Sequence, residues 1–374
     1  MLKTTNVYFP NLNGIRFIAA LAVIIHHVEQ YKFIFGFDSL WTSSSFIRAI
    51  GKLGVMLFFT LSGFLITYLL LTEEKEKGKI SIKQFYIRRM LRIWPLYYLI
   101  FFLAFFVLAN LNFFRLPNVP VVKVDDFTTI TCFIFFLSNY YLAFFAIFPY
   151  AAQTWSVSTE EQFYLVWPWI LKFSKNKLLS LIVVVAIVTI VNVFFTSHYS
   201  YVIENRIKYY TFWNMFNIDC MAIGGIFAYL LFIKAKILKY IMNKYFFAVI
   251  ILFIIAELKF EFYIPIVTKY FPNEMWGILF GLVILNLSSV KELKSLLENR
   301  LFNYLGTISY GLYMFQGILV VTVMKLAIQI NFTNDIFIYT ASILLTIVVA
   351  HFSYFYFEKW FLKFKHKFTV IKTL

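Results

Sequence analysis

Charged residues are scarce in this 374-residue chain: Asp, Glu, Lys and Arg together make up 14% of it, whereas apolar residues make up 61%. One soluble core could not bury that much apolar surface, so the composition excludes an ordinary water-soluble domain. The apolar stretches 178–196 and 245–256 lack the alternation of a barrel strand, and in lipid the backbone must satisfy its own hydrogen bonds. The sequence therefore predicts an all-α polytopic membrane protein.

Cysteine is also nearly absent. The two cysteines, Cys132 and Cys220, lie in apolar segments without a pairing pattern, so we expect neither a disulfide framework nor a metal site. Acidic residues are the rarer charge, 18 against 34 Lys and Arg, and the basic residues form short clusters between apolar stretches. Cytoplasmic loops carry such clusters, so we expect a lipid bilayer and no nucleic acid as the partner.

At about 20 apolar residues per crossing, the sequence predicts ten transmembrane helices in a single domain over residues 1–374, without an internal repeat. The spans are expected at 13–32, 50–71, 93–113, 154–173, 178–196, 213–233, 243–258, 274–290, 303–326 and 336–357. No small-residue cleavage site follows the first span, so it is expected to be retained and not removed as a signal peptide.

The segment 129–149 is apolar enough to be an eleventh span, but Ser138, Asn139 and a tyrosine pair interrupt it. If it crosses, most Lys and Arg residues fall in outer loops. If it does not, most fall in inner loops, as the positive-inside rule requires. We therefore expect a re-entrant or interfacial segment there, with both termini in the cytoplasm.

The first span carries Arg16 and His27, which lie 11 positions apart and so share one helix face, roughly 16 Å from each other. His26 points away from that face. An ionisable side chain at membrane depth needs a partner, a wet cavity or a function. A neutral imidazole is the usual general base near pH 7, although a histidine that bonds two helices together is the alternative interpretation.

The fourth span opens with a polar run that includes Glu160 and Glu161. A helix N-terminus favours carboxylates, which is one explanation. The predicted topology also puts His27 and these glutamates in the same outer third of the membrane, where a carboxylate could orient the imidazole or bind a polar acceptor. Asp219 in the sixth span is expected at a similar level.

The third span is introduced by Arg88, Arg89 and Arg92. Basic residues at a cytoplasmic helix end often anchor to anionic headgroups. Because Arg89 and Arg92 are one turn apart, they could instead hold a phosphorylated ligand by bidentate contacts. On the second span, Gly51, Gly54 and the Ser62-Gly63 pair are also typical of close helix packing.

Five stretches stand in order along nearly the whole chain. They are residues 12–16 with His27, 54–64, the stretch around Arg89 and Arg92, 155–164, and 308–313. Together they resemble the bacterial acyltransferase-three family of membrane O-acyltransferases. The resemblance implies a membrane enzyme of the bacterial inner membrane that moves an acyl group, usually acetyl from acetyl-CoA, to a hydroxyl of a cell-envelope carbohydrate or a similar acceptor.

Carried over to this chain, the family's Arg-ten-His motif falls on Arg16 and His27, its Arg-two-Arg motif on Arg89 and Arg92, and its acidic motif on Glu160 and Glu161. Many relatives append an extracytoplasmic esterase-like domain, whereas this chain ends soon after the tenth expected span. We therefore expect a stand-alone membrane domain. Four further residues are expected to contact substrate: Ser62, Trp155, Asp219 and Tyr313.

Our hypothesis is that acyl-CoA docks from the cytoplasm on Arg88, Arg89 and Arg92, and that no metal takes part. Arg16 is a further candidate, as a donor ligand or as a catalytic residue with His27. His27 takes the proton of the acceptor hydroxyl, and Glu160 or Glu161 fixes its tautomer. A covalent acyl-enzyme on His27 or Ser62 is a variant of this mechanism. Two alternatives stay open: a transporter or flippase for an envelope polysaccharide precursor, and a passive scaffold.

Overall fold

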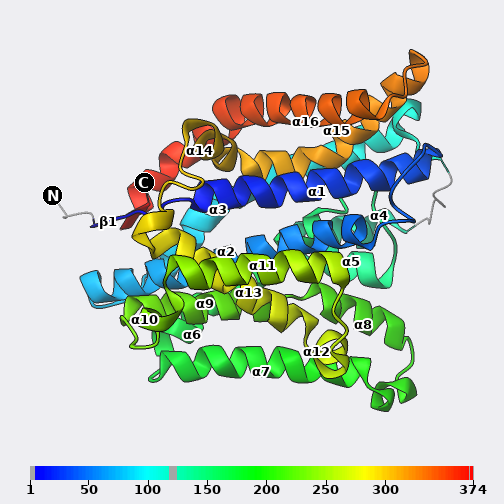
Figure 1. Ribbon diagram of the computed structural model, residues 1–374. Coiled ribbons are helices and arrows are strands. Elements are labelled where there is room, and N and C mark those ends of the chain that lie inside the picture. The colour runs from blue at the N-terminus through cyan, green and yellow to red at the C-terminus, as the bar shows by residue number, and fades with distance from the viewer. Residues whose placement is uncertain (1–4, 118–123, 370, 374) are drawn as a thin grey trace.

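The fold is described from a computed structural model, which describes residues 5–117, 124–369 and 371–373. Long helices lie side by side along one axis, and both chain termini lie at the same end (Figure 1). At that end two three-residue strands, β1 (Thr5–Val7) and β2 (Ile371–Thr373), pair in parallel. The rest of the described chain is helical or loop, which confirms the all-α class.

The long helices follow the expected apolar stretches. They are α1 (Leu12–Phe35), α2 (Ser45–Lys77), α3 (Ile82–Phe102), α6 (Thr154–Phe173), α7 (Lys177–Thr196), α9 (Ile218–Phe232), α11 (Lys244–Phe260), α13 (Pro272–Ser289), α15 (Ser309–Gln329) and α16 (Asp335–Phe352). The short helices are α4 (Asp126–Ile134), α5 (Ser138–Phe144), α8 (Arg206–Met215), α10 (Leu238–Ile241), α12 (Pro265–Tyr270), α14 (Arg300–Thr307) and α17 (Lys359–Lys365). A π-helical segment, Ser353–Glu358, joins α16 to α17.

Seven helices in the described part of the chain are long and apolar enough to cross a membrane. They are Leu12–Phe35, Ser45–Lys77, Ile82–Asn110, Lys177–Thr196, Arg206–Phe232, Ser309–Gln329 and Asp335–Lys365. The other three expected spans coincide with α6, α11 and α13, which do not combine the length and the apolarity of these seven. The count of ten and the cytoplasmic position of the termini stay predictions.

The outer surface of the helical body is apolar. On α7, for example, large apolar side chains are exposed along the helix, at Leu179, Ile182, Val183, Ile187 and Ile190. Only 17% of the most apolar part of α7 is buried inside the protein. Apolar side chains on an outward helix face are what lipid contact requires, which supports a multi-pass membrane protein.

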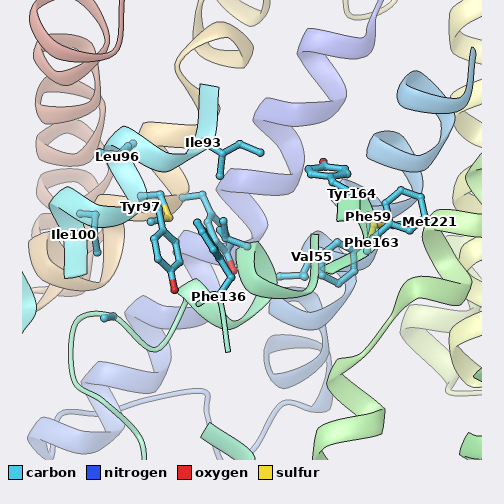
Figure 2. Packing of buried hydrophobic residues seen from close by; sticks show 14 of the residues in the cluster. Val55, Phe59, Ile93, Leu96, Tyr97, Ile100, Phe136, Phe163, Tyr164 and Met221 are labelled. Carbon is cyan, nitrogen blue, oxygen red and sulfur yellow. The ribbon is translucent and has the colours of Figure 1, made fainter. Parts of the chain in front are cut away.

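The segment expected to be re-entrant or interfacial forms the short helices α4 and α5. Each is far below the about 20 residues that a crossing needs. Phe136 turns the chain between them with φ 54°, and its ring packs 4.4 Å from that of Tyr97 (Figure 2). Asn139, one of the polar residues that interrupt this apolar stretch, exchanges amide hydrogen bonds of 2.9 and 3.0 Å with Gln162 of α6. The segment of α4 and α5 is therefore bound to α6. Its depth in the membrane stays a prediction.

Helices α2 and α9 approach so closely that glycine is required on both. A Cβ atom at Gly63 would lie 1.8 Å from the carbonyl oxygen of Met221, and one at Gly224 would lie 2.0 Å from that of Thr60. Small residues at a crossing let two membrane helices bring their backbones together. The structure thus confirms the packing interpretation of Gly63, and Met221 lies beside Phe59 and Phe163 in the core next to this crossing (Figure 2).

We expect Gly63→Ala to destabilise the protein, because the added methyl group meets backbone and not a flexible side chain. Overpacking of this kind costs about 1–3 kcal/mol or more. Thermal unfolding of the purified protein in detergent measures the loss. Gly317→Ala is the matched control, since a Cβ there meets nothing nearer than 3.7 Å. Equal unfolding temperatures for the two variants would contradict the packing role of Gly63.

Candidate active site

A cavity of about 430 Å³ lies among α1, α2, α3, α6, α15 and the α16–α17 segment. Tyr8 lines it close to the chain termini and is 47% exposed, so the cavity reaches solvent at that end. Six of the predicted site residues line it: Arg16, Ser62, Arg89, Arg92, Glu160 and Tyr313. We call it the arginine cavity.

The start of α1, which carries Arg16, is fixed by a buried asparagine. Asn11 has a left-handed φ of 66°, and its side-chain amide donates to the carbonyls of Leu287 and Leu293 at 2.7 and 2.8 Å. Its backbone N–H donates to the Glu298 carboxylate at 2.6 Å. One turn into the helix, the Arg16 Nη1 donates to the Asn13 side-chain oxygen at 2.8 Å. This network holds Arg16 at the cavity wall.

The three cavity arginines form no ion pair with the part of the chain that the structure describes. Within the described residues, no carboxylate oxygen lies within 4.0 Å of Arg16, Arg89 or Arg92. The Arg89 guanidinium instead lies over the rings of Phe85 and Tyr164, at 5.8 and 6.0 Å, and its buried Nε has no hydrogen-bond partner. A half-buried positive charge without a carboxylate nearby is poorly solvated, so the cavity is suited to an anionic ligand.

A hydroxyl and a carboxylate meet beside these arginines. The Ser62 hydroxyl on α2 donates to Glu160 Oε1 on α6 at 2.8 Å, and both residues line the cavity. The glycine crossing with α9 fixes the adjacent turn of α2 and so sets the direction of Ser62. This arrangement can hold a hydroxyl in a defined orientation or accept its proton.

The second glutamate points elsewhere. Glu161 Oε2 accepts a hydrogen bond of 3.0 Å from the Trp94 indole on α3, its Oε1 has no partner, and it does not line the arginine cavity. Trp155, expected to contact substrate, packs its ring 6.1 Å from that of Phe59 and is also absent from the lining. Adjacent residues on a helix are about 100° apart, which explains why only one glutamate faces the cavity.

His27 lies outside the arginine cavity. Its Nδ1 lies 2.9 Å from the carbonyl oxygen of Val23. A carbonyl oxygen only accepts, so Nδ1 carries the hydrogen and the lone pair of the neutral ring is on Nε2. The prediction that a glutamate fixes this tautomer is wrong, because the backbone one turn back does so. Glu160 lies about 9 Å into α6 from Thr154, at the level of Arg16 and not of His27.

An aromatic pair from α2 and α15 lines the cavity on the side towards His27. The rings of Phe58 and Tyr313 lie 6.0 Å apart, and the Tyr313 hydroxyl is 2.7 Å from the Ser156 hydroxyl and donates to the Gln153 carbonyl at 3.0 Å. One turn further along α15, a Cβ at Gly317 would meet Tyr31 and Gln153. The Tyr31 ring is 6.4 Å from that of His27. His27 therefore belongs to a second polar region, beyond this aromatic pair.

Two other predicted residues have different surroundings. Arg88 forms a 2.8 Å ion pair with Glu73 and donates to the Phe368 carbonyl at 3.0 Å. It therefore faces away from the cavity and links α2 to the segment after α17. Asp219 is fully buried at the start of α9, where its Oδ1 accepts from the Cys220 backbone N–H at 2.9 Å. Neither residue lines the arginine cavity. Within the described residues, no group of three or more His, Cys, Asp or Glu side chains could hold a metal ion.

The sequence reasoning missed the wall formed by the C-terminal helices. Tyr354, Glu358, Leu362 and Lys365 all line the cavity. Their spacing of four, four and three residues is the signal that could have found them, because it places all four on one helix face. The expected tenth span ended at residue 357, which left most of this face among the cytoplasmic loops.

The chain matches the family described as the acyltransferase domain over residues 9–354. The chain belongs to this acyltransferase family. The resemblance inferred from the five motifs is thereby confirmed, as is the enzyme class at the level of the family.

Curated relatives of this acyltransferase are similar over part of their length. A peptidoglycan O-acetyltransferase of Listeria monocytogenes is 32% identical over 196 residues, which cover 50% of this chain and 29% of the relative. An O-acetyltransferase of Staphylococcus aureus is 33% identical over 174 residues, 44% of this chain and 25% of the relative. The matches thus span less than a third of these relatives. No solved structure matches the chain.

We expect Arg88→Ala to lower the thermal stability of this acyltransferase, because it leaves the Glu73 carboxylate, whose side chain is 3% exposed, without its partner. Breaking a buried ion pair from one side costs about 3–5 kcal/mol. Lys177→Ala is the control, since its pair with Glu74 is more exposed and is worth about 1 kcal/mol or less. Unfolding temperatures in detergent measure both variants, and equal small losses would contradict a structural role for Arg88.

Proposed function

We propose that the protein transfers an acyl group from acyl-CoA, with acetyl-CoA as the main donor, to a hydroxyl of a cell-envelope carbohydrate. The observation that carries the proposal is the arginine cavity. Arg16, Arg89 and Arg92 line it, and among the residues that the structure describes no carboxylate lies within 4.0 Å of them. Guanidinium groups bind phosphate by paired, charge-assisted hydrogen bonds. A CoA thioester carries several phosphate groups and supplies the missing negative charge.

The inner wall of the cavity is largely apolar, which supports a CoA thioester as the ligand: the arginines would meet its phosphates and the apolar wall its thioester arm. Val55, Phe58, Phe59 and Val157 line it alongside Ser62 and Glu160. An apolar wall suits an uncharged arm and a short acyl group, and a few placed polar groups orient the reacting atoms. In the proposed complex the phosphates lie at the cavity mouth, near Tyr8, and the thioester lies at the aromatic end.

His27 is the proposed base. Its Nε2 lone pair is the one free to accept a proton from the acceptor hydroxyl, since Nδ1 is engaged by the Val23 carbonyl. The hydroxyl oxygen attacks the thioester carbonyl, the carbon–sulfur bond breaks, and the CoA thiolate leaves and takes up a proton. Because Phe58 and Tyr313 line the cavity on the side towards His27, the acyl group passes this pair in the proposed reaction to meet the acceptor.

The acceptor class rests on the relatives. The Listeria relative is a peptidoglycan O-acetyltransferase, which supports a glycan of the cell envelope as the acceptor. With both termini in the cytoplasm, as the sequence predicts, the arginine cavity faces the cytoplasmic donor and the region of His27 faces the outer acceptor. The bacterial inner membrane is the location that fits this arrangement.

The central test is acetyl-CoA binding and turnover by the purified protein in lipid nanodiscs. We expect Arg89→Gln to weaken acetyl-CoA binding about tenfold to hundredfold, because a charged hydrogen-bond donor is worth about 1.5–3 kcal/mol. Lys83→Ala, an exposed change at the start of the same helix, is the control and should bind normally. A wild-type protein that neither binds nor cleaves acetyl- or succinyl-CoA would contradict the proposal and favour a transporter.

The role of His27 has its own test. His27→Asn keeps a donor for the Val23 carbonyl but removes the basic nitrogen, so we expect acyl transfer to fall at least about a hundredfold, while acetyl-CoA binding persists. His26→Asn is the matched control, since His26 Nδ1 makes the same kind of bond, 2.9 Å from the Ile47 carbonyl. Transfer is measured as labelled acetyl on the glycan acceptor. Folded His27→Asn protein with normal transfer would exclude His27 as the base.

A further inference from the structure

The C-terminal helices form a wall of the arginine cavity that lies largely beyond the family match. The match ends at residue 354, whereas Glu358, Leu362 and Lys365 follow it. The π-helical segment Ser353–Glu358 joins α16 to α17 and keeps these side chains on the cavity face. π-helical turns within helices are frequent at functional sites.

Lys365 adds a fourth positive charge to this cavity. Four cations line the cavity, Arg16, Arg89, Arg92 and Lys365, but only two of its lining residues are carboxylates, Glu160 and Glu358. Both carboxylates already accept from a hydroxyl: Glu160 from Ser62 at 2.8 Å, and Glu358 from a serine in its own segment at 3.0 Å. In the described part of the chain, no carboxylate lies within 4.0 Å of the Lys365 ammonium.

The position of Lys365 is held from outside the cavity. Three residues beyond it, the Phe368 carbonyl accepts from Arg88 Nη1 at 3.0 Å, and Arg88 is itself fixed by its ion pair with Glu73. Further along the chain, β2 pairs with β1. The residues that follow β1, Tyr8 and Phe9, line the cavity. The two chain termini therefore close around the cavity mouth, with Lys365 half-buried on one side of it.

We propose that Lys365 binds a phosphate group of the nucleotide part of the donor at the cavity mouth, so that the C-terminal segment completes the donor site. The inference rests on the proposed use of acyl-CoA. An ammonium group on a flexible stem recognises phosphate as a point charge, whereas the arginines provide directed, paired hydrogen bonds. Lys365 thus selects for a phosphorylated donor and takes no part in the bond changes at the thioester.

The test compares CoA with pantetheine, which has the same thiol arm without the nucleotide phosphates. In nanodiscs, Lys365→Ala should weaken CoA binding about tenfold or more and leave pantetheine binding unchanged. With acetyl-CoA as the substrate, KM should rise by a similar factor while kcat stays within about twofold. Lys365→Arg should retain most of the affinity, because it keeps the charge.

Lys363→Ala is the matched control, since Lys363 is exposed on the same helix and does not line the cavity. Folded Lys365→Ala protein that binds CoA as the wild type does would overturn the proposal. So would an equal loss of CoA and pantetheine binding, which would indicate a general effect on the cavity. A wild-type protein that binds no CoA would refute the proposed function itself, and these outcomes are distinguishable by the wild-type measurement alone.

Discussion

The close crossing of α2 and α9 sets the geometry at the centre of this acyltransferase. At Gly63 and Gly224 the two backbones approach within a distance that no side chain allows, so α2 is fixed in both depth and rotation. Ser62 precedes Gly63, and this rotation directs it to Glu160 on α6. A second hydrogen bond between α2 and α6 holds these two helices together: the Trp167 indole N–H donates to the Thr67 hydroxyl at 2.9 Å.

The pairing of buried charges separates structure from function in this molecule. Lys32 is 2% exposed and lies 2.9 Å from both Glu29 and Asp335, and Glu29 accepts a further bond from Tyr339. Each charged side chain of that cluster has a partner of opposite charge, and the cluster joins α1 to α16. In the described part of the chain, no carboxylate lies within 4.0 Å of the cations of the arginine cavity. A charge in a low-dielectric surrounding favours a counter-ion strongly. That contrast is the physical basis for the proposal that the cavity binds an anionic donor.

The polar residues form two regions along the first helix, and the division between them differs from the expected one. Glu160 lies with the arginines, because it is well into α6, whereas His27 lies with Tyr31 and Gln153 beyond the aromatic pair. In the proposed reaction the donor and the base thus approach from opposite sides of Phe58 and Tyr313. This separation suits an enzyme whose donor and acceptor are kept apart by a membrane.

The sequence alone determined the helical class, the approximate helix positions and the shared face of Arg89 and Arg92, because apolar runs and the 3.6-residue period are local properties. The motifs also indicated the family. Only the tertiary structure decided between neighbours: Arg88 turns to Glu73, and Glu161 turns to Trp94, while Arg89 and Glu160 face the cavity. Only the tertiary structure shows that Lys365 lines the same cavity. Such choices depend on how each helix is rotated against its neighbours, and that rotation follows from contacts between residues far apart in the chain.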